Sequence, residues 1–534
     1  MTKRKSNPFI SGALTLTIAA IVIKILSAVY RIPFQNIVGD IGFYIYQQVY
    51  PIYGAAVVIA TYGFPVVISK MSVDRKKKSG EKAVQRMLVI AAAFLFMLGA
   101  AAFFIFYFGA ERIASSMDDP QLAQLIRIIS FVFLIIPFTA VCRGYFQSLG
   151  DMNPTAYSQL GEQTVRVGTI LICAAVLVDS HDLYTVGAGA VFGSITGAAA
   201  ACIIMAYYIR KKVGKSFKTF LDICKSVQLH EAASIAKVLL IQGFAVCASS
   251  LLLIFMQLAD SFNLFSLLIS SGMNGEDAKE LKGVFDRGQP LLQLGSVAAT
   301  AMSLSLVPLI ANRQKEGEKR KAAGEIKLAV RLSIAVGLGA SAGLISIIRQ
   351  TNMMLFENTS GSDVLLVLSW AILLSSVIIT IISILQGMGH MMFPAFVVLS
   401  GLFLKYSLNI IFVPRFGTMG AAIATNAALV FILVILFAKL LHFMGQPLVS
   451  ISFLIKTGFG AAVMFIVLKG YLFMTGFMYD VSHERLAASF QAMTGVLIGG
   501  AVYLFIIIRL KCFTLRELVL LPFGSRLLLF YPKR

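Results

Sequence analysis

The chain is dominated by apolar runs of about 20 residues that recur from one end of the sequence to the other. Each run is long enough to cross a hydrocarbon layer of roughly 30 Å as an α-helix. Runs such as 88–108 are apolar on every side, whereas a membrane barrel needs segments of about ten residues that alternate between apolar and polar. Of all residues, 58% are hydrophobic and 13% are charged, an apolar excess that one soluble core could not bury. The sequence therefore predicts an all-α, polytopic membrane protein.

About fourteen of these runs qualify as transmembrane helices. The first six are predicted at 8–32, 43–68, 88–108, 123–143, 155–178 and 185–209. The other eight are predicted at 238–262, 287–311, 328–347, 363–385, 396–412, 418–440, 453–472 and 487–508. An even number of crossings places both termini on the same side of the membrane.

The charges between the runs indicate the orientation, because loops rich in Lys and Arg stay in the cytoplasm. The basic loops are 69–87, 210–218 and 312–327. The loops between them are acidic or nearly neutral, at 109–120, 179–182 and 357–363. This alternation predicts that both termini are cytoplasmic and that the chain lies in the cell membrane. It also accounts for the net charge of +21, so no nucleic acid is needed as a partner.

Two segments of mixed basic and apolar character are predicted to lie along the cytoplasmic surface. One is the linker at 213–236, and the other is 512–534, which is interrupted by Pro522 and Arg526. This composition suits an interfacial helix that binds anionic membrane lipids. An ordinary solvated linker and tail are the alternative.

Two motifs occur twice in the same order. A Gln-x-x-Gly motif at 147–150 recurs at 386–389, and a Thr-x-Gly-Ala motif at 185–188 recurs at 418–421, with offsets of 239 and 233 residues. Internal repeats are typical of secondary transporters, whose substrate site lies between two related lobes. The predicted parts are an N-lobe at 1–212, a linker at 213–236, a C-lobe at 237–441, two further helices within 442–508 and a cytoplasmic tail at 509–534.

Cations inside the membrane are the most informative residues, because an ionisable group near the middle of a helix costs roughly 2.5 to 3.5 kcal/mol on insertion scales. Lys24 and Arg31 lie seven residues apart in the first helix and share one face, which predicts an anion site. For Arg31, the alternative is a side chain that reaches the outer interface. Arg287 follows Asp286 at the start of the eighth helix and is predicted to face the same cavity.

The remaining intramembrane charges are interpreted as supporting groups. Glu162 and Arg166 are spaced to form an ion pair one turn apart in the fifth helix, and this pair is expected to be structural. Asp260 ends the seventh helix, and Asp286 opens the eighth. Lys405 belongs to a weaker polar stripe in the eleventh helix.

The sequence contains no sign of an enzyme. It lacks a GxxxxGK[ST] nucleotide loop, an HExxH motif and a GxSxG motif. The six cysteines form no CxxC pair and are interpreted as small core residues. We therefore expect no catalytic residue, cofactor or metal, and an ion gradient or the membrane potential as the energy source. Several converging cations suit an anionic cargo such as a diphosphate or a carboxylated sugar.

Residues 9–70 resemble the opening of the polysaccharide-transport branch of the MOP flippase superfamily, which includes SpoVB-like and MurJ-like (lipid II flippase-related) proteins. The segments that carry this resemblance are Lys24-Ile-Leu-Ser-Ala-Val-Tyr-Arg31, Gly39 and Gly63-Phe-Pro65. The first Gln-x-x-Gly motif, the 162–166 element and the 286–287 pair also fit, so the resemblance extends over nearly the whole chain.

This resemblance implies a MOP/MATE-like fold, with two pseudo-symmetric six-helix lobes around a cationic cavity and two C-terminal helices. In MurJ-like members, the two extra helices form a hydrophobic groove for a lipid tail, which implies that role for 453–472 and 487–508. The family's cavity cations correspond to Lys24, to Arg31 with a one-residue shift, and to Arg287. MurJ-like members carry another Arg late in the second helix, where 53–62 has no charge here, so the substrate need not be lipid II.

The predicted function is a flippase. It would move a lipid-linked anionic (undecaprenyl-diphosphate) sugar precursor of peptidoglycan or another envelope polysaccharide from the cytoplasmic to the outer leaflet by alternating access. Lys24, Arg31 and Arg287 would bind the headgroup. One alternative is a MATE-like cation or drug antiporter, which would place acidic residues in the membrane. Another is a non-transporting scaffold for envelope synthesis. A link to sporulation would follow from kinship with SpoVB-like proteins alone.

Overall fold

The computed structural model describes residues 8–213, 228–297, 318–481, 483–515 and 517, and within them the regular structure is all helical. The chain divides into two compact units. Unit 1 contains residues 1–286 and 390–414, and unit 2 contains residues 287–389 and 415–534. These units do not follow the boundaries of the lobes inferred from the sequence repeat, and the lobes remain a prediction.

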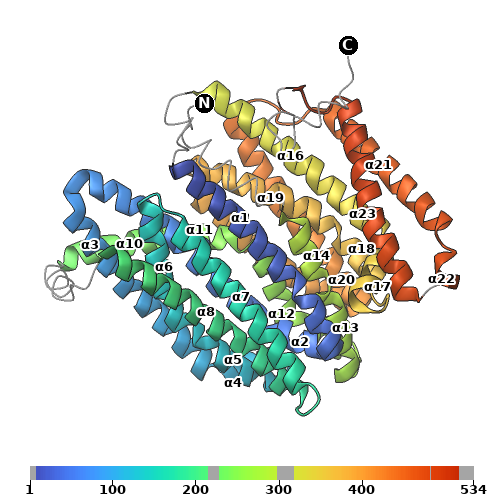
Figure 1. Cartoon of the computed structure of the whole chain (residues 1–534), viewed down its shortest axis with the longest axis horizontal. Helices are drawn as coiled ribbons and strands as arrows, with labels where there is room; N and C mark the ends of the chain where they lie inside the picture. The colour runs from blue at the N-terminus through green and yellow to red at the C-terminus, as the bar shows by residue number, and fades with distance from the viewer. Residues whose placement is uncertain (1–7, 214–227, 298–317, 482, 516, 518–534) are drawn as a thin grey trace. The chain divides into compact units, whose positions relative to one another are not determined.

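Unit 1 is built from these helices: α1 (Pro8–Val29), α2 (Arg31–Val58), η1 (Ile59–Gly63), α3 (Phe64–Phe108), α4 (Ala110–Ser116), η2 (Pro120–Leu122), α5 (Ala123–Ser130), α6 (Val132–Ser148), α7 (Asn153–Leu177), α8 (Leu183–Val213), α10 (Leu229–Val238), η3 (Leu239–Gly243), α11 (Phe244–Ser250), α12 (Leu252–Ser270) and α13 (Gly275–Asp286). The helices η1 and η3 are π-helical turns, and η2 is a 3₁₀ turn. In Figure 1, α7 and α8 run side by side, as their packing contacts require.

Unit 2 is built from these helices: α14 (Gly288–Gly295), α16 (Lys319–Ser346), α17 (Ile348–Phe356), α18 (Ser362–Leu368), α19 (Trp370–Gly387), α21 (Ile451–Met474), α22 (Met478–Val481) and α23 (Glu484–Arg509). The long helix α20 (Met392–Met444) begins in unit 1 and ends in unit 2. Helices α21 and α23 pack against each other (Figure 1) and coincide with the last two predicted membrane helices.

Eleven helical stretches among the described residues are long and apolar enough to cross a membrane. The longest, Ile18–Phe108, contains glycine corners at Gly39 and Gly80 and so holds three successive helices. Another corner, at Gly417 in α20, likewise separates two helices. These findings confirm an all-helical polytopic membrane protein and agree with about fourteen membrane helices. Part of the predicted eighth helix, 298–311, lies outside the described residues.

Gly39 and Gly80 each turn the chain within a single residue. Their φ and ψ angles are 70° and −175° at Gly39, and 78° and −173° at Gly80, a combination essentially open only to glycine. The segment 69–87 is consequently helical on both sides of Gly80, which corrects the expectation of a loop. Its Lys, Arg and Glu residues are good helix formers, so the helices extend through them up to the corner.

The repeated Gln-x-x-Gly motif has the same local structure in both copies. The Gly150 N–H donates to the Gln147 carbonyl at 3.1 Å, and the Gly389 N–H donates to the Gln386 carbonyl at 3.0 Å. Both glycines have positive φ, 75° and 90°. The two sequence copies therefore end a helix by the same turn.

Helix α8 begins at a capping carboxylate. Asp182 Oδ1 accepts hydrogen bonds from the Tyr184 N–H at 2.9 Å and the Thr185 N–H at 3.2 Å, while Oδ2 accepts from the Thr185 hydroxyl. These donors stabilise the ionised form and hold the pKa of Asp182 below its usual value. The acidic segment 179–182 thus provides the N-cap of the sixth predicted membrane helix.

The predicted surface segments are described only in part. Of 213–236, residues 214–227 lie outside the described residues, while the remainder contains the start of α10. The tail is described through residue 517, where the Arg331 guanidinium of α16 pairs with Glu517 at 2.8 Å.

Candidate anion site and the buried charges

Arg31 follows the end of α1 without a break in the helical backbone. Tyr30, between α1 and α2, has φ −63° and ψ −25°, its N–H donates to the Leu26 carbonyl, and its carbonyl accepts from the Phe34 N–H. The helix therefore continues to the corner at Gly39. Lys24, which is half-buried, and Arg31 lie two turns apart on one side of this helix, as their spacing predicts.

The Arg31 guanidinium is buried against aromatic rings. Arg31 is 1% exposed, and its Cζ lies 4.2 Å from the ring centroid of Tyr50 and 6.0 Å from that of Tyr30. Its Nε and Nη1 atoms have no hydrogen-bond partner within the described part of the chain. The guanidinium is therefore packed inside the protein and is not exposed at its surface. A buried guanidinium with two unused donors has the chemistry to bind an anion.

Arg166 reaches the same rings from α7. Its Nη2 donates to the Tyr30 hydroxyl at 2.7 Å and to the Tyr46 hydroxyl at 3.0 Å, and its Cζ lies 4.3 Å from the ring centroid of Tyr53. The hydroxyls of Tyr30 and Tyr46 are 2.8 Å apart. The members of this arginine–tyrosine cluster are Arg31, Arg166, Tyr30, Tyr46, Tyr50 and Tyr53.

Glu162 pairs with Arg143, and not with Arg166 as its helical spacing predicts. The Arg143 Nη2 of α6 donates to Glu162 Oε2 at 2.7 Å. The same guanidinium donates to the Ser158 hydroxyl at 3.1 Å and, within η1, to the Thr61 hydroxyl at 3.2 Å and the Ala60 carbonyl at 3.4 Å. Arg143 lies on the neighbouring helix α6, and its guanidinium finds several acceptors at this place, including Glu162. Glu162 therefore pairs with Arg143 in preference to Arg166 on its own helix. The predicted pairing of Glu162 with Arg166 is therefore wrong, and the structural role of Glu162 remains a prediction.

Asp260 of α12 is paired with Lys405 of α20. The two side chains are 2% and 1% exposed and form an ion pair, and Asp260 Oδ1 also accepts from the Asn409 amide at 3.0 Å. Asn409 in turn donates to Asn263 Oδ1 at 2.8 Å. The polar stripe of the eleventh predicted helix thus neutralises a carboxylate of the seventh.

Asp286 is paired with Lys282 one turn earlier in α13. The Lys282 ammonium donates to Asp286 Oδ2 at 2.6 Å, and both side chains are buried. Asp286 also lies close enough to Arg31 to interact electrostatically. Helix α13 packs directly on the backbone of α2, because a Cβ at Gly283 would lie 2.1 Å from the Asp40 carbonyl oxygen.

Most buried charges of unit 1 fall into two groups. The buried carboxylate of Asp119 belongs to neither, because it accepts from the Tyr44 hydroxyl at 3.0 Å and the Tyr184 hydroxyl at 2.7 Å. Three carboxylates, Glu162, Asp260 and Asp286, each have a direct cationic partner. Arg31 and Arg166 contact tyrosine rings and hydroxyls instead. A cation–π contact contributes about 0.5 to 2 kcal/mol, less than the several kcal/mol that burial of a charge costs. The arginine–tyrosine cluster therefore carries an excess of positive charge that suits an anionic ligand.

Arg287 is fully buried in unit 2, where it contacts the segment that joins α17 to α18. Its Nη1 donates to Asn358 Oδ1 at 2.7 Å and to Asn352 Oδ1 at 3.3 Å, and its Cζ lies 5.2 Å from the Phe356 ring centroid. These contacts hold a turn in place. The predicted role of Arg287 in headgroup binding remains a prediction.

Several important residues were not singled out from the sequence. The tyrosines at 46, 50 and 53 recur at helical spacing, a pattern that indicates one shared face. Lys282 was also missed, although its spacing to Asp286, which the sequence did single out, is that of a helical ion pair. Arg143 carries no such local signal, because its acceptors come from other helices. Among the described residues, no group of three or more His, Cys, Asp or Glu side chains could hold a metal ion.

Sequence comparison identifies related membrane proteins. Residues 9–314 match the family described as "Polysaccharide biosynthesis protein". The "Uncharacterized membrane protein YabM" of Bacillus subtilis (strain 168) is 42% identical and covers 98% of this chain and 96% of its own length. From the same organism, "Lipid II flippase MurJ" is 24% identical over 94% of this chain and 95% of its own, and "Stage V sporulation protein B" is 24% identical over 98% and 99%.

Solved structures show the same fold. "Lipid II flippase MurJ, inward closed conformation" matches with a TM-score of 0.65 at 14% identity, over 93% of this chain and 97% of that chain. An inward-facing multidrug resistance MATE family transporter of the MOP superfamily matches with a TM-score of 0.62 at 16% identity, over 80% and 98%. The resemblance drawn from sequence motifs is confirmed, and the matched proteins include a lipid II flippase and a multidrug transporter.

Proposed function

Because the chain belongs to the polysaccharide biosynthesis protein family, we propose that it is a flippase for a lipid-linked, anionic sugar precursor. The precursor would carry an undecaprenyl-diphosphate group and serve peptidoglycan or another envelope polysaccharide. Transport would run from the cytoplasmic to the outer leaflet of the cell membrane, with both chain termini in the cytoplasm. Similarity to "Lipid II flippase MurJ" over most of the chain supports this class of substrate.

The observation that carries the proposal is the arginine–tyrosine cluster. Two buried guanidinium groups share the rings of Tyr30 and Tyr50, and one of them has two donors without a partner in the described chain. A diphosphate offers several charged oxygens that accept hydrogen bonds from such donors. Arg31, Arg166 and Lys24 are the cations proposed to bind the headgroup.

The lipid tail would remain in the bilayer while the headgroup passes. Helices α21 and α23 are the proposed groove for the tail, and both expose large apolar side chains such as Phe459, Ile466, Met493 and Leu497. Alternating access between two lobes would move the headgroup across, driven by an ion gradient or the membrane potential. Anionic lipids and a coupling ion are the other proposed partners.

The pairing of the buried carboxylates argues against a MATE-like cation antiporter. Glu162, Asp260 and Asp286 are already neutralised by basic side chains, so they are poor ligands for a cationic drug. The MATE structures share the fold, which by itself does not determine the cargo. A non-transporting scaffold for envelope synthesis would not need two buried arginines without carboxylate partners.

The test is a leaflet-accessibility assay in vesicles that contain the purified protein and an undecaprenyl-diphosphate sugar. The sugar should become accessible on the opposite face only when the protein is present. Lys24→Ala and Arg166→Gln should each abolish this transport without lowering protein abundance, and Arg287→Ala tests the contribution to headgroup binding that the sequence predicts for Arg287. Arg127→Gln is the matched control, since Arg127 forms an exposed pair with Glu111. Normal transport by both Lys24→Ala and Arg166→Gln would remove the proposed headgroup site.

A further inference from the structure

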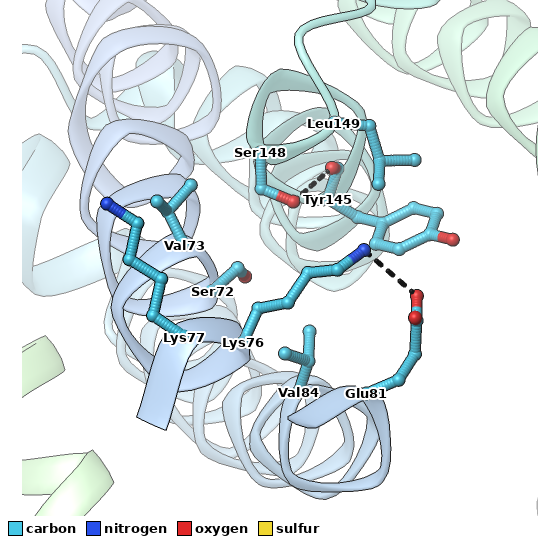
Figure 2. Close-up of a pocket in the computed structure, with 9 residues that line it drawn as sticks. All are labelled: Ser72, Val73, Lys76, Lys77, Glu81, Val84, Tyr145, Ser148 and Leu149. Carbon is cyan, nitrogen blue, oxygen red and sulfur yellow. Dashed lines mark hydrogen bonds and ion pairs between the residues drawn. The ribbon is translucent and has the colours of Figure 1, made fainter. Parts of the chain in front are cut away.

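Helix α3 turns at Gly80, and we call the parts before and after this residue the two arms of the α3 hairpin. A pocket of about 320 Å³ lies in unit 1 between these two arms and the end of α6. Figure 2 shows its lining side chains, and none of them belongs to the arginine–tyrosine cluster. They are Ser72, Val73, Lys76, Lys77, Glu81, Val84, Tyr145, Ser148 and Leu149. The pocket therefore combines hydroxyl groups, two lysines, the Glu81 carboxylate and an apolar wall.

Ser72 is the most informative residue of the pocket. It is 1% exposed, and its hydroxyl has no hydrogen-bond partner within the described chain. Serines in helices commonly donate to a preceding carbonyl, as Ser148 does to the Tyr145 carbonyl at 2.6 Å across the same pocket. A buried hydroxyl without a partner is unfavourable by about 1–3 kcal/mol. A ligand that accepts a hydrogen bond from Ser72 would remove that penalty.

Lys76 supplies a positive charge that can leave its present partner, Glu81, for another anion. Its ammonium lies 3.4 Å from the Glu81 carboxylate, but the two side chains are 55% and 67% exposed. Exposed pairs of this kind contribute only about 0 to 1 kcal/mol, so a stronger anion can replace Glu81 at small cost. In Figure 2 the Lys76 ammonium lies beside the Tyr145 ring, at the side of the pocket that Glu81 faces.

The hairpin that forms the pocket is braced from outside. Glu231 of α10 accepts from Arg75 on the first arm at 2.5 Å and from Arg86 on the second arm at 3.2 Å. With the corner at Gly80, this bridge fixes the distance between the arms. The pocket is therefore formed before any ligand arrives, which lowers the entropic cost of binding.

The location favours a lipid as the source of the ligand. The segment 69–87 contains seven Lys or Arg and two Asp or Glu, and this excess predicts that it faces the cytoplasmic leaflet. That leaflet is rich in anionic lipids, which attract basic segments close to the membrane. The apolar wall of Val73, Val84 and Leu149 can contact the first carbons of a lipid, while the hydroxyls and Lys76 face its phosphate.

We propose that this pocket binds the phosphate headgroup of an anionic lipid from the cytoplasmic leaflet. Ser72 donates its hydroxyl hydrogen to a phosphate oxygen, and Lys76 leaves Glu81 to pair with the same group. A phospholipid such as phosphatidylglycerol and a lipid-linked diphosphate both offer this chemistry. The proposal goes beyond the flippase function, because the pocket is separate from the arginine–tyrosine cluster. Lipid binding at the pocket can be measured without measuring transport.

The experiment measures dissociation constants for the purified full-length protein in detergent. The probes are dioctanoyl phosphatidylglycerol, farnesyl diphosphate, inorganic phosphate and dioctanoyl phosphatidylcholine. The variants are Ser72→Ala and Lys76→Gln, with Lys82→Gln as the matched control. Lys82 is an exposed lysine on the same hairpin that does not line the pocket. Thermal unfolding is recorded for each protein, and Ser72→Ala should be at least as stable as the parent, because it removes an unpartnered hydroxyl.

Ser72→Ala and Lys76→Gln should each weaken binding of an anionic lipid probe about tenfold, whereas Lys82→Gln should leave it unchanged. A response with phosphatidylglycerol alone identifies a phospholipid, and a response with farnesyl diphosphate alone identifies a lipid-linked diphosphate. Equal losses in Lys76→Gln and Lys82→Gln would overturn the proposal, because they indicate diffuse surface charge. So would equally tight binding of phosphatidylcholine or of inorganic phosphate. If Ser72→Ala does not fold, Lys76→Gln against Lys82→Gln decides the result.

Discussion

Arg143 and Arg31 are both buried arginines of unit 1, but their surroundings differ completely. Arg143 donates to a carboxylate, two hydroxyls and a backbone carbonyl. Arg31 lies over the ring of Tyr50 and leaves two nitrogen atoms without a partner in the described chain. The first arrangement stabilises the fold, because every charge is matched. The second leaves a positive charge that, in the proposed function, pairs with the headgroup of the substrate.

This difference teaches that a buried cation is best interpreted from its counter-charge and not from its depth. Replacing one member of a matched pair leaves the other charge buried and alone, so the fold is destabilised. Replacing a cation that has no carboxylate partner removes a cost, so the fold is preserved while the ligand is lost. Stability and transport should therefore respond in opposite ways in the two regions.

The largest effect is expected from Arg143→Ala. It leaves the Glu162 carboxylate buried without its partner and exposes unsatisfied acceptors in η1, so the free energy of unfolding should fall by about 3–5 kcal/mol. Thermal unfolding of the purified protein and its abundance in membranes measure this loss. Arg143→Met combined with Glu162→Gln should recover part of it. Unchanged stability in Arg143→Ala would contradict a structural role for the pair.

Arg31→Gln should act on transport instead. Loss of a buried charge contact to a diphosphate costs about 2 kcal/mol or more, which corresponds to a decrease in transport of about thirtyfold or more. The unfolding temperature should stay nearly the same or rise, because Asp286 keeps its direct partner Lys282 and no other carboxylate is paired with Arg31 in the described part of the chain. Vesicle assays and thermal unfolding of the same preparation measure both quantities. A large loss of stability in Arg31→Gln would remove the distinction between the two regions.

Gly283→Ala tests how α13 is held against α2. The new Cβ would lie 2.1 Å from the Asp40 carbonyl oxygen, so the helices must separate, at a cost of about 1–3 kcal/mol. Thermal unfolding measures the change. Gly168→Ala in α7 is the control: its Cβ would meet nothing within 4 Å, and the change should be neutral or stabilising. Equal behaviour of the two variants would show that the close approach at Gly283 carries no energy.

The smallest effect is expected from Tyr53→Phe. The ring 4.3 Å from the Arg166 guanidinium is retained, so the free energy of unfolding should change by less than about 0.5 kcal/mol. Tyr53→Leu removes the ring and should cost about 0.5–2 kcal/mol. Chemical denaturation that resolves these two variants tests whether the aromatic face contributes to holding Arg166. Equal stability of both variants would show that it does not.

Hydropathy and charge were sufficient to predict the helical membrane fold and some of the residues that carry buried charge, such as Arg31, Asp260 and Arg287, but not Arg143 or Lys282. The partners of those charges were harder to predict, because spacing along one helix gives no information about neighbouring helices. Glu162 shows this limit: its spacing to Arg166 fits an ion pair, but the pair forms with Arg143 on α6. The contacts of the tyrosines at 30, 46, 50 and 53 with arginine were also not predicted, since an aromatic residue in a membrane helix usually indicates packing or an interfacial position.

The single-residue corners at Gly39 and Gly80 have a mechanical consequence. At each corner the two helical segments meet at a single glycine, with no coil between them. We therefore expect a displacement of one segment to move the next segment directly. Lys24, Arg31, the tyrosines and the proposed lipid pocket lie on three successive segments of this kind. A flexible insert at either glycine would uncouple them, whereas the same insert in the segment 179–182 should be tolerated.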